Sequence, residues 1–546
     1  MKISLCQINP IIGDFIYNSS LIMKAVEDSR KSGCSLAIFP ELSLMGYPPK
    51  DLLEKPAFIS ENLRYLEALA SQIKDIHVLC GYVDRNPGKN GKTLINSAAV
   101  LRDGNILGRG GKMLLPSYDV FDETRYFEPA KESLLFELEE KRIGVTICED
   151  IWNVGDIEIA PRYSQDPVKR LSSKGIDILI NISASPFSLN KARLRMKVLK
   201  AISLKYNIPI LYCNQVGGND DLLFDGSSMV VDKSGRLILQ AKEFEPDSII
   251  WDSNKDYDEI EDYKTTEEES LLSGLIMGTR DYATKCGFKK VLVGLSGGID
   301  SSLVAVIAQR AMGPENVIGV SMPSPFTSLM SRKCARALAN NLKINFREIP
   351  ISDIFESYKT SLSSTFKGLS EDVTEENIQA RIRGNILMAL SNKFNVLLLT
   401  TGNKSETATG YCTLYGDMSG GLAVISDVPK TLCYRLVRYI NSEGEIIPEY
   451  TITRPPSAEL RNNQKDQDTL PPYDILDSIV EAIVEKNLSV DDIVAMGHDP
   501  DIVKDVLKRI VFNEHKRRQA APGLKITSKA FGYGRRYPIA WGRKLY

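Results

Sequence analysis

Histidine is nearly absent from this sequence. Of its 546 residues only three are histidine, at positions 77, 498 and 515. A reactive thiol or hydroxyl usually depends on a histidine to take its proton. If the chain is a hydrolase or transferase with a covalent intermediate, another base has to do this work.

Other features are missing as well. No apolar run reaches the roughly 18 residues of a membrane span, and the start, MKISLCQINPIIGD, has no long apolar signal core or cleavage site. The nine cysteines contain no CxxC pair, which indicates a reducing compartment rather than a disulfide framework or a zinc site. The net charge of -2 gives no reason to expect nucleic-acid binding. We expect a cytoplasmic protein without membrane or nucleic-acid partners.

What is present is an ordinary globular composition, 43% hydrophobic and 25% charged, over a length that suggests more than one domain. Up to about residue 250, short apolar runs alternate with helical patterns. Because these runs stop at polar residues, they predict the strands of an α/β layered domain. The runs are LAIFP, HVLCGYV, INSAAVL, IGVTIC, IDILINIS, PILYCNQV and SSMVVD.

An acidic stretch, DSNKDYDEIEDYKTTEEES, follows and is typical of a solvated linker or a helix start. A second α/β pattern then opens with KKVLVGLSGGIDSSLVAVIAQRA and continues through NVIGVSMPS, INFREIPI and NVLLLTTGN. We place the boundary near residue 262, which gives domains of residues 1–261 and 262–546. The proline-rich segment EYTITRPPSAELRNNQKDQDTLPPYDILD is expected to be mostly loop.

The first candidate site contains a cysteine at a strand end. In RIGVTICEDIW the apolar alternation stops at Cys148. Glu41 ends another strand and Lys112 follows a glycine pair. If these segments converge, Glu41 can take the thiol proton, and Lys112 can stabilise the thiolate and the oxyanion of an acyl-transfer intermediate. Taken alone, a cysteine is usually a small buried residue.

Three segments, FPELSLMGYP, GGKMLLPSYDVFDE and ICEDIW, occur in the order found in the nitrilase superfamily and resemble its signatures. The resemblance implies an αββα sandwich with a catalytic triad of Glu41, Lys112 and Cys148. In the glutamine-hydrolysing branch it also implies that Tyr118 and Glu123 line the amide pocket. Ser185, in NISASPF, looks like a further pocket residue.

The second candidate site is a glycine turn between a strand and a helix, VLVGLSGGIDSS. Its backbone N–H groups and the helix N-terminus can hold an anion. The phosphate-loop pattern GxxxxGK[ST] and the fingerprint GxGxxG are both absent. Asp300 offers a carboxylate for Mg²⁺. Alternatively, Asp300 has no ligand and is simply an acid at a helix N-terminus, stabilised by the helix dipole.

SGGIDS resembles the pyrophosphate loop of the N-type ATP pyrophosphatases, which implies a doubly wound parallel sheet. NIQARIRG, TTGNKSETATGYCTLYGDMSG and DVPKT narrow the resemblance to the NAD⁺ synthetases in that group. It implies that Asp300 and Glu406 share Mg²⁺. The implied ATP-binding residues are Ser296, Gly297, Gly298, Ile299, Asp300, Ser301, Ser302, Ser321, Met322 and Thr401. The implied substrate-binding residues are Asn377, Arg381, Asp417 and Lys430, together with Lys525 and Ser528.

Together the two regions resemble the glutamine-dependent NAD⁺ synthetases over nearly the whole chain. The resemblance implies a ligase that amidates nicotinic acid adenine dinucleotide, with ATP as co-substrate, Mg²⁺ as cofactor and glutamine as nitrogen donor. It also implies a homo-oligomer of at least two copies. Two alternatives stay open at this point: a related ammonia ligase acting on nicotinic acid mononucleotide, and a catalytically decayed scaffold.

Overall fold

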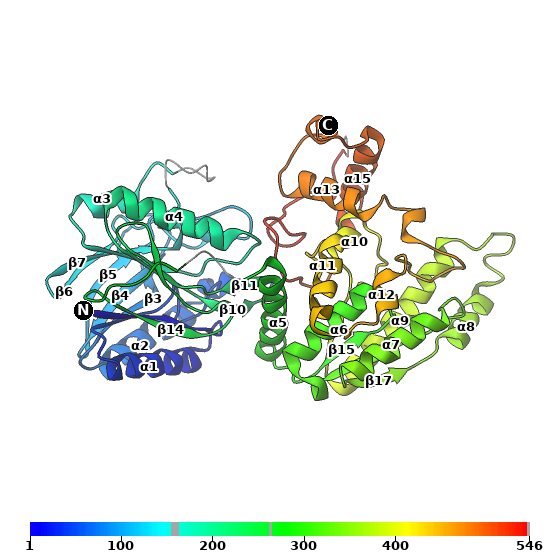
Figure 1. The fold of residues 1–546 in the computed structure, drawn as a ribbon, viewed down its shortest axis with the longest axis horizontal. Helices are drawn as coiled ribbons and strands as arrows, with labels where there is room; N and C mark the ends of the chain where they lie inside the picture. Colours follow the sequence, from blue (N-terminus) through cyan, green and yellow to red (C-terminus); the bar gives the residue numbers. More distant parts are fainter. Residues whose placement is uncertain (154–162, 261–264, 543–546) are drawn as a thin grey trace. The chain divides into compact units, whose positions relative to one another are not determined.

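The computed structural model describes residues 1–153, 163–260 and 265–542. The chain divides into two units, Met1–Thr266 and Glu267–Tyr546 (Figure 1). The boundary predicted near residue 262 lies outside the described residues. Among the described residues, no helix is both long and apolar enough to cross a bilayer.

In its described part, the first unit contains two six-stranded sheets and a separate hairpin. The first sheet has the order β14 (Asp247–Asp252), β1 (Lys2–Gln7), β2 (Leu36–Ile38), β3 (His77–Arg85), β4 (Leu94–Arg102) and β5 (Asn105–Gly111). The second has the order β13 (Leu237–Gln240), β12 (Met229–Val231), β9 (Ile210–Asn214), β8 (Ile178–Ser183), β7 (Lys141–Ile147) and β6 (Leu134–Leu138). The hairpin pairs β10 (Val216–Asn219) with β11 (Leu222–Asp225).

The two sheets pack face to face, and helices cover their outer faces. Strand β2 shows why its sequence is apolar throughout: Leu36 and Ile38 lie in the core between the sheets, whereas Ala37 packs under the helices. The helices are α1 (Phe15–Lys31) and α2 (Pro56–Gln72) on the first sheet, and α3 (Pro167–Ser173) and α4 (Lys191–Tyr206) on the second. The predicted αββα sandwich is confirmed.

The second unit is built on an all-parallel sheet. Its order is β17 (Asn345–Glu348), β16 (Val317–Ser321), β15 (Val291–Gly294), β18 (Leu397–Thr400) and β19 (Leu422–Ala423). The chain runs outward from β15 through β16 to β17 and then returns to the other side at β18. This doubly wound order, also predicted, opens a crevice at the carboxyl ends of β15 and β18.

Helices surround this sheet and extend beyond it. They are α5 (Glu267–Lys285), α6 (Ile299–Met312), α7 (Leu329–Asn341), α8 (Ser352–Leu362), α9 (Val373–Phe394), α10 (Lys404–Thr409), α11 (Lys430–Ile440), α12 (Glu449–Thr453), α13 (Tyr473–Val484), α14 (Val490–Ala495), α15 (Pro500–Phe512) and α16 (Glu514–Arg517). Helix α5 begins in the acidic stretch. The three glutamates in its first turn interact favourably with the positive end of the helix dipole. The segment predicted to be mostly loop carries short helices at both ends, and each starts directly after a proline, Pro448 and Pro472.

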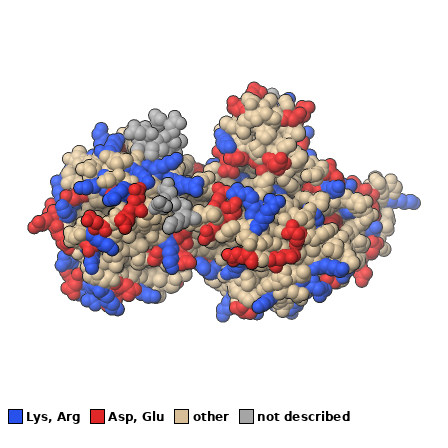
Figure 2. Space-filling model, viewed as in Figure 1, with Lys and Arg blue, Asp and Glu red and all other residues tan. Residues whose placement is uncertain are grey.

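Surface charge is mixed in sign. Figure 2 shows lysine and arginine side chains intermixed with aspartate and glutamate over the visible face of each unit. The balance agrees with the net charge of -2.

Two candidate active sites

The first unit brings three strand ends together around a buried lysine. Glu41 follows β2, Lys112 follows β5 and Cys148 follows β7. The Nζ of Lys112 donates to Glu41 Oε1 at 2.8 Å and to Glu123 Oε1 at 2.7 Å. Glu41 and Lys112 have no exposed surface, and Cys148 is 3% exposed. The predicted lysine and glutamate are therefore in direct contact, with Glu123 as a second carboxylate on the same lysine.

Both carboxylates have further donors. Glu41 accepts from Asn96 Nδ2 at 2.7 Å and from the backbone N–H of Ala184 at 2.9 Å. Glu123 accepts from the Tyr47 hydroxyl at 2.9 Å. Burial raises the pKa of Glu123 to about 7; the lysine opposes this rise, and the negative charge of Glu41 adds to it. Glu123 therefore titrates near neutral pH.

Cys148 begins the turn that follows β7, with a φ of 45°. This backbone conformation is uncommon for a residue other than glycine and turns the chain sharply out of the strand. Burial raises the pKa of the Cys148 thiol well above its usual value; the charge of Glu41 adds to this rise and that of Lys112 opposes it. The resting sulfur is therefore a protonated thiol that needs a base, and Glu41 is the carboxylate with the largest electrostatic effect on it.

Asp150 fastens the cysteine turn to the lysine segment. Its Oδ1 accepts from the backbone N–H groups of Met113 at 3.0 Å and Leu114 at 2.9 Å. Its Oδ2 accepts from the N–H of Ile147 at 3.0 Å. Burial raises the pKa of Asp150 to about 7, and these three N–H groups oppose that rise. The carboxylate thus fixes the residue before the thiol relative to the residues after the lysine.

A further carboxylate stands next to the thiol in the chain. Glu149 directly follows Cys148 and accepts from the Tyr118 hydroxyl, 3.1 Å from each carboxylate oxygen, and from the Tyr163 hydroxyl at 2.8 Å. Glu149 is buried, which raises its pKa. Ser185 is also buried, and its backbone N–H donates to Asn214 Oδ1 at 2.9 Å. A carboxylate here can receive a cationic group of a bound molecule.

The sequence interpretation missed several of these groups. Glu149 and Asp150 stood next to the candidate cysteine in ICEDIW, and two acids after a buried strand were a usable signal. Asn96 is a polar residue inside the apolar strand LINSAAVL, which is another such signal. Nothing in the sequence marked Tyr163, because it lies 14 positions after Glu149 in the chain and no local pattern links the two.

In the second unit the serines of the glycine turn form hydrogen bonds within the turn itself. The Ser301 hydroxyl donates to Gly298 O at 3.1 Å, and the Ser302 hydroxyl donates to the same oxygen at 2.8 Å. The N–H of Gly298 donates to Ser296 Oγ at 3.1 Å. Gly297 has a φ of +77°, and a Cβ there would lie 2.2 Å from the Ser331 carbonyl oxygen. Only glycine fits that position.

A buried lysine also lies between two acids in this unit. Lys430 Nζ contacts Asp300 Oδ2 and lies 3.9 Å from Glu406 Oε1. Asn403 joins both acids: its Nδ2 donates to Asp300 Oδ1 at 3.2 Å, and its Oδ1 accepts from the Glu406 N–H at 3.0 Å. Burial raises the pKa of Glu406 to about 8; the charge of Asp300 adds to this rise and Lys430 opposes it.

These two acids fit a magnesium ion. Carboxylate oxygens are its preferred protein ligands, and one or two of them with substrate phosphates commonly complete its shell. Asp300 and Glu406 both lie within 4.0 Å of the single ammonium group of Lys430, so a divalent cation would offset the remaining negative charge. Among the described residues no group of three or more His, Cys, Asp or Glu side chains forms a metal cluster.

A cavity of about 320 Å³ opens at the carboxyl ends of β15, β16 and β18. Most of the predicted ATP, metal and substrate residues line it, and six do not. The predicted residues on its wall are Ser296, Gly298, Ile299, Asp300, Ser301, Ser321, Met322, Thr401, Glu406, Asp417 and Lys430. The predicted residues that do not line it are Gly297, Ser302, Asn377, Arg381, Lys525 and Ser528.

Asn377, Arg381 and Asp417 nevertheless meet at one loop. Thr413 joins two of them, because its hydroxyl donates to Asn377 Oδ1 and its N–H donates to Asp417 Oδ1, both at 2.7 Å. Arg381 Nε donates to the Leu414 carbonyl at 3.3 Å. Burial raises the pKa of Asp417 to about 6.

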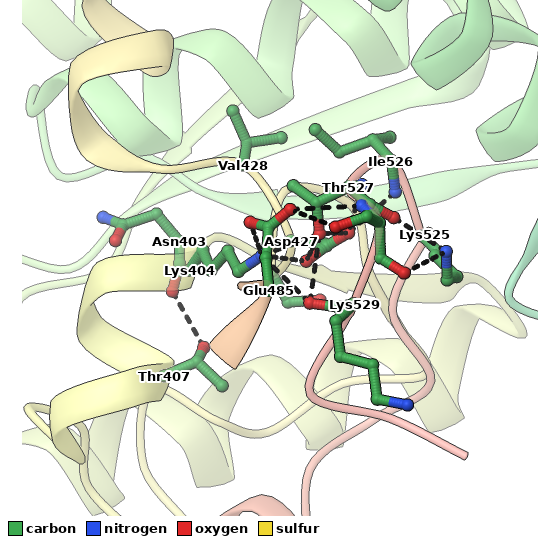
Figure 3. A network of polar contacts seen from close by, with 12 residues as sticks. Asn403, Lys404, Thr407, Asp427, Val428, Glu485, Lys525, Ile526, Thr527 and Lys529 are labelled. Atoms are coloured by element: carbon green, nitrogen blue, oxygen red, sulfur yellow. Dashed lines mark hydrogen bonds and ion pairs between the residues drawn. The ribbon is translucent and has the colours of Figure 1, made fainter. Parts of the chain in front are cut away.

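Lys525 belongs to a different polar network, around Lys404 (Figure 3), and Ser528 joins that network through Glu485. Lys404 Nζ donates to Glu485 Oε1 at 2.8 Å and lies 3.1 Å from Asp427 Oδ1. Ser528 donates to Glu485 Oε2 at 2.7 Å. Lys525 Nζ donates to the carbonyl oxygens of residues 527 and 528, at 2.7 and 3.3 Å. This network ties the segment that contains both residues to the start of helix α10, which also contains Glu406.

Three arginines on the cavity wall, Arg383, Arg454 and Arg517, were not anticipated. Arg383 is half-buried and donates Nε to the Met322 carbonyl at 3.0 Å. Across the described ranges, no carboxylate lies within 4.0 Å of its guanidinium, and burial lowers its pKa to about 10. Arg454 directly follows α12, and Arg517 is the last residue of α16. Arg383 lies in the motif NIQARIRG, but the family resemblance implied a role only for Arg381 in that motif.

Each unit matches a known protein family. Residues 2–260 match the family Carbon-nitrogen hydrolase, and residues 271–520 match the family NAD synthase. The glutamine-dependent NAD(+) synthetases of Synechocystis sp. and Thermotoga maritima are each 46% identical to this chain. These matches cover 98% and 99% of this chain, respectively, and 98% of each relative.

A solved structure agrees over the full length. The glutamine-dependent NAD+ synthetase from Acinetobacter baumannii, in complex with adenosine diphosphate, is 41% identical and superimposes with a TM-score of 0.78, covering 100% of this chain and 99% of that one. The enzyme of the same name from Cytophaga hutchinsonii, at 21% identity and a TM-score of 0.84, supports the fold. Sequence identity of 46% over nearly the whole length, together with both sites, shows that this chain belongs to the glutamine-dependent NAD⁺ synthetase family.

Proposed function

We propose that this protein makes NAD⁺ by amidating nicotinic acid adenine dinucleotide, with ATP as co-substrate and glutamine as the source of ammonia. The observation that carries this proposal is the presence in one chain of a buried Glu-Lys-Cys site and a glycine-turn cavity lined by acids and a lysine. The full-length identity to enzymes of that name supports it.

In the first site Cys148 is the nucleophile and Glu41 the base. Glu41 takes the thiol proton as sulfur attacks the amide carbon of glutamine, and it returns the proton to the departing ammonia. A water molecule, deprotonated by Glu41, then cleaves the thioester and releases glutamate. Lys112 keeps Glu41 oriented and stabilises negative charge that develops on the amide oxygen. Glu149 receives the α-ammonium group of glutamine.

In the second site the carboxylate of the dinucleotide attacks the α-phosphorus of ATP. The bond to the bridging oxygen breaks, and pyrophosphate leaves. Ammonia then attacks the acyl carbon and AMP departs. Asp300 and Glu406 would hold Mg²⁺, which neutralises phosphate charge when bound. The SGGIDS turn presents backbone N–H groups to the phosphates, and Lys430 adds positive charge beside them.

The test is a complete product analysis with the purified protein, Mg²⁺, ATP and either glutamine or ammonium chloride. We expect NAD⁺, AMP and pyrophosphate in equal amounts with both donors, and one glutamate per NAD⁺ with glutamine. Nicotinic acid mononucleotide serves as the competing substrate. Faster amidation of the mononucleotide would replace the proposed substrate, and no pyrophosphate with either compound would indicate a decayed enzyme.

We also propose that the protein acts as a homo-oligomer of at least two copies, as the family resemblance implies. Light scattering coupled to gel filtration measures this directly. A molar mass near that of one 60.8 kDa chain at assay concentration would contradict it.

A further inference from the structure

Arg454 lies over the glycine turn of the second site. Helix α12 is tied to that turn because the Thr451 hydroxyl donates to the Gly297 carbonyl at 3.2 Å. An atom placed as Cβ on Gly298 would lie 3.5 Å from Arg454 Nη2. The same cavity is lined by Arg454, Ser296, Gly298 and others of the turn. A guanidinium thus covers the segment that should receive phosphate.

The guanidinium is only partly engaged by the protein. Its Nη1 donates to Ser331 Oγ and to Glu459 Oε1, the latter at 3.1 Å. Ser331 also donates to Glu459 Oε1, at 2.7 Å. In the described part of the chain neither Nε nor Nη2 of Arg454 donates a hydrogen bond. Two nitrogens of a planar fork therefore remain available on a side chain that is only 11% exposed.

A structural role is the competing explanation. Arg454 and Glu459 could simply staple the loop between them, five residues apart. That role accounts for Nη1 but not for the placement of Nη2 against Gly298. Glu459 itself has a φ of 49°, a conformation that is uncommon for glutamate. The loop thus holds a carboxylate against the arginine that lies over the turn.

The charges at the turn also call for another cation. Lys430 already contacts Asp300, so its charge is largely balanced by the protein. The two leaving phosphates of ATP carry several negative charges, and an arginine fork binds two phosphate oxygens at once. Because Glu459 is negatively charged and shares Nη1, it competes with such a ligand for the same group.

We propose that Arg454 binds the β- and γ-phosphates of ATP, and the pyrophosphate that they become, and that Glu459 is the carboxylate which phosphate displaces from it. This assignment rests on the proposed ATP chemistry of the second site. In each catalytic cycle Arg454 then releases the Glu459 carboxylate and binds phosphate oxygens instead. Glu459 weakens pyrophosphate binding, which favours product release.

The experiment compares Arg454→Gln, Glu459→Gln and the double variant in ammonia-dependent NAD⁺ formation. The readouts are the Michaelis constant for ATP, that for the dinucleotide, and the inhibition constant of added pyrophosphate. Arg454→Gln should raise the ATP and pyrophosphate constants about tenfold or more, since charge-assisted hydrogen bonds are lost. The dinucleotide constant should stay within about twofold.

The direction in which Glu459→Gln changes the pyrophosphate inhibition constant decides between the two explanations. It should lower the pyrophosphate inhibition constant about threefold, because a neutral amide competes less for the guanidinium. In the double variant this gain should vanish. A mere loop staple predicts that both single variants shift the constants in the same direction. That outcome, or an unchanged pyrophosphate constant in Arg454→Gln, overturns the proposal.

Two controls keep the result interpretable. Arg461→Gln removes an arginine of the same segment that pairs with Glu376 and Asp468 and does not line the cavity, so it should leave the pyrophosphate constant unchanged. If Arg454→Gln does not fold, Arg454→Lys keeps the charge without the fork and should raise the constant several-fold. If the wild type is active but the Arg454 variants have unchanged ATP and pyrophosphate constants, only the role of Arg454 is rejected. A wild type that forms no NAD⁺ rejects the proposed function.

Discussion

Each unit of this protein contains a buried lysine between two carboxylates, but the two arrangements differ. In the first, Lys112 Nζ is almost equidistant from Glu41 and Glu123, at 2.8 and 2.7 Å. In the second, Lys430 contacts Asp300 and is 3.9 Å from Glu406. Both clusters have one positive group for two acids, so each carries an excess negative charge when both acids are ionised.

The difference lies in how that excess can be neutralised. In the first cluster the acids are held by side-chain and backbone donors, and a proton near neutral pH suffices. In the second, Glu406 faces a cavity of about 320 Å³ and has its pKa raised to about 8. The same three charges therefore suit proton transfer in one unit, and cation and phosphate binding in the other.

The sharpest separation of the two sites comes from Cys148→Ala. Glutamine-dependent NAD⁺ formation should fall about 10³-fold or more, because the nucleophile is lost. Ammonia-dependent formation should persist, since SGGIDS and Lys430 lie in the other unit. The measurement is NAD⁺ formed with each donor, with Cys80→Ala as a control for removal of a buried thiol. Retained use of glutamine would dismiss Cys148 as the nucleophile.

Replacing each lysine tests whether the clusters are functionally distinct. Lys112→Met should abolish glutamine use and spare ammonia use. Lys430→Met should reduce ligation about 10²–10³-fold with both donors, because a charge beside the reacting phosphates is lost. Rates with the two donors separate these outcomes, and circular dichroism checks the fold. Equal loss of both activities in Lys112→Met would contradict the separation.

Glu123→Gln tests the proton in the first cluster. The pKa of Glu123 is raised to about 7, so in the wild type its protonation below that pH removes one partner of Lys112. We expect wild-type glutaminase kcat/KM, measured as glutamate formed, to fall as the pH drops through about 7. The variant should be about tenfold slower at pH 8 and nearly independent of pH between about 6 and 8. An unchanged acid limb would exclude Glu123 as its origin.

The proton on Glu123 also affects stability, and here the pH dependence is reversed: wild-type activity falls as the pH drops, whereas wild-type stability falls as the pH rises. Because the folded pKa of Glu123 exceeds its usual value of 4.5, the folded state holds the proton more tightly than the unfolded state. That stabilisation is complete below about pH 4.5 and is lost as pH rises through about 7. The free energy of unfolding should therefore shift in favour of Glu123→Gln by about 1–3 kcal/mol between pH 5 and pH 8. Urea unfolding at both pH values measures it, and no shift would place the titration elsewhere.

The smallest effect is expected from Ser528→Ala. Ser528 donates to Glu485 and does not line the cavity. We expect Michaelis constants for ATP and the dinucleotide within about twofold of wild type, with a lower melting temperature from one lost charge-assisted hydrogen bond. A several-fold rise in the dinucleotide constant at unchanged melting temperature would instead support the substrate contact that the family resemblance implies.

The sequence predicted most where function follows directly after a strand. Glu41 and Cys148 could be placed because an apolar run ends immediately before each of them, and because carboxyl ends of parallel strands converge. The glycine turn was visible because a positive φ and a close backbone approach leave a glycine in the sequence.

What could not be predicted depends on contacts between distant segments. Lys404 meets Glu485 across 81 residues, and Arg454 meets Ser331 across 123. No local pattern announces such pairs, because a polar residue in a loop looks the same whether it faces solvent or a partner. This is why the network around Lys404, and the arginine over the glycine turn, emerged only from the folded chain.

The burial of Cys148 has a consequence for chemical labelling. Its thiol is 3% exposed and protonated at rest, whereas Cys286 lies exposed on the second unit. General thiol reagents require an accessible thiolate, so they should mark Cys286 first and leave the nucleophile intact. A reagent that enters as glutamine does would be activated by Glu41 only after binding. Selectivity in any covalent probe of this enzyme would then come from its shape rather than from its reactivity.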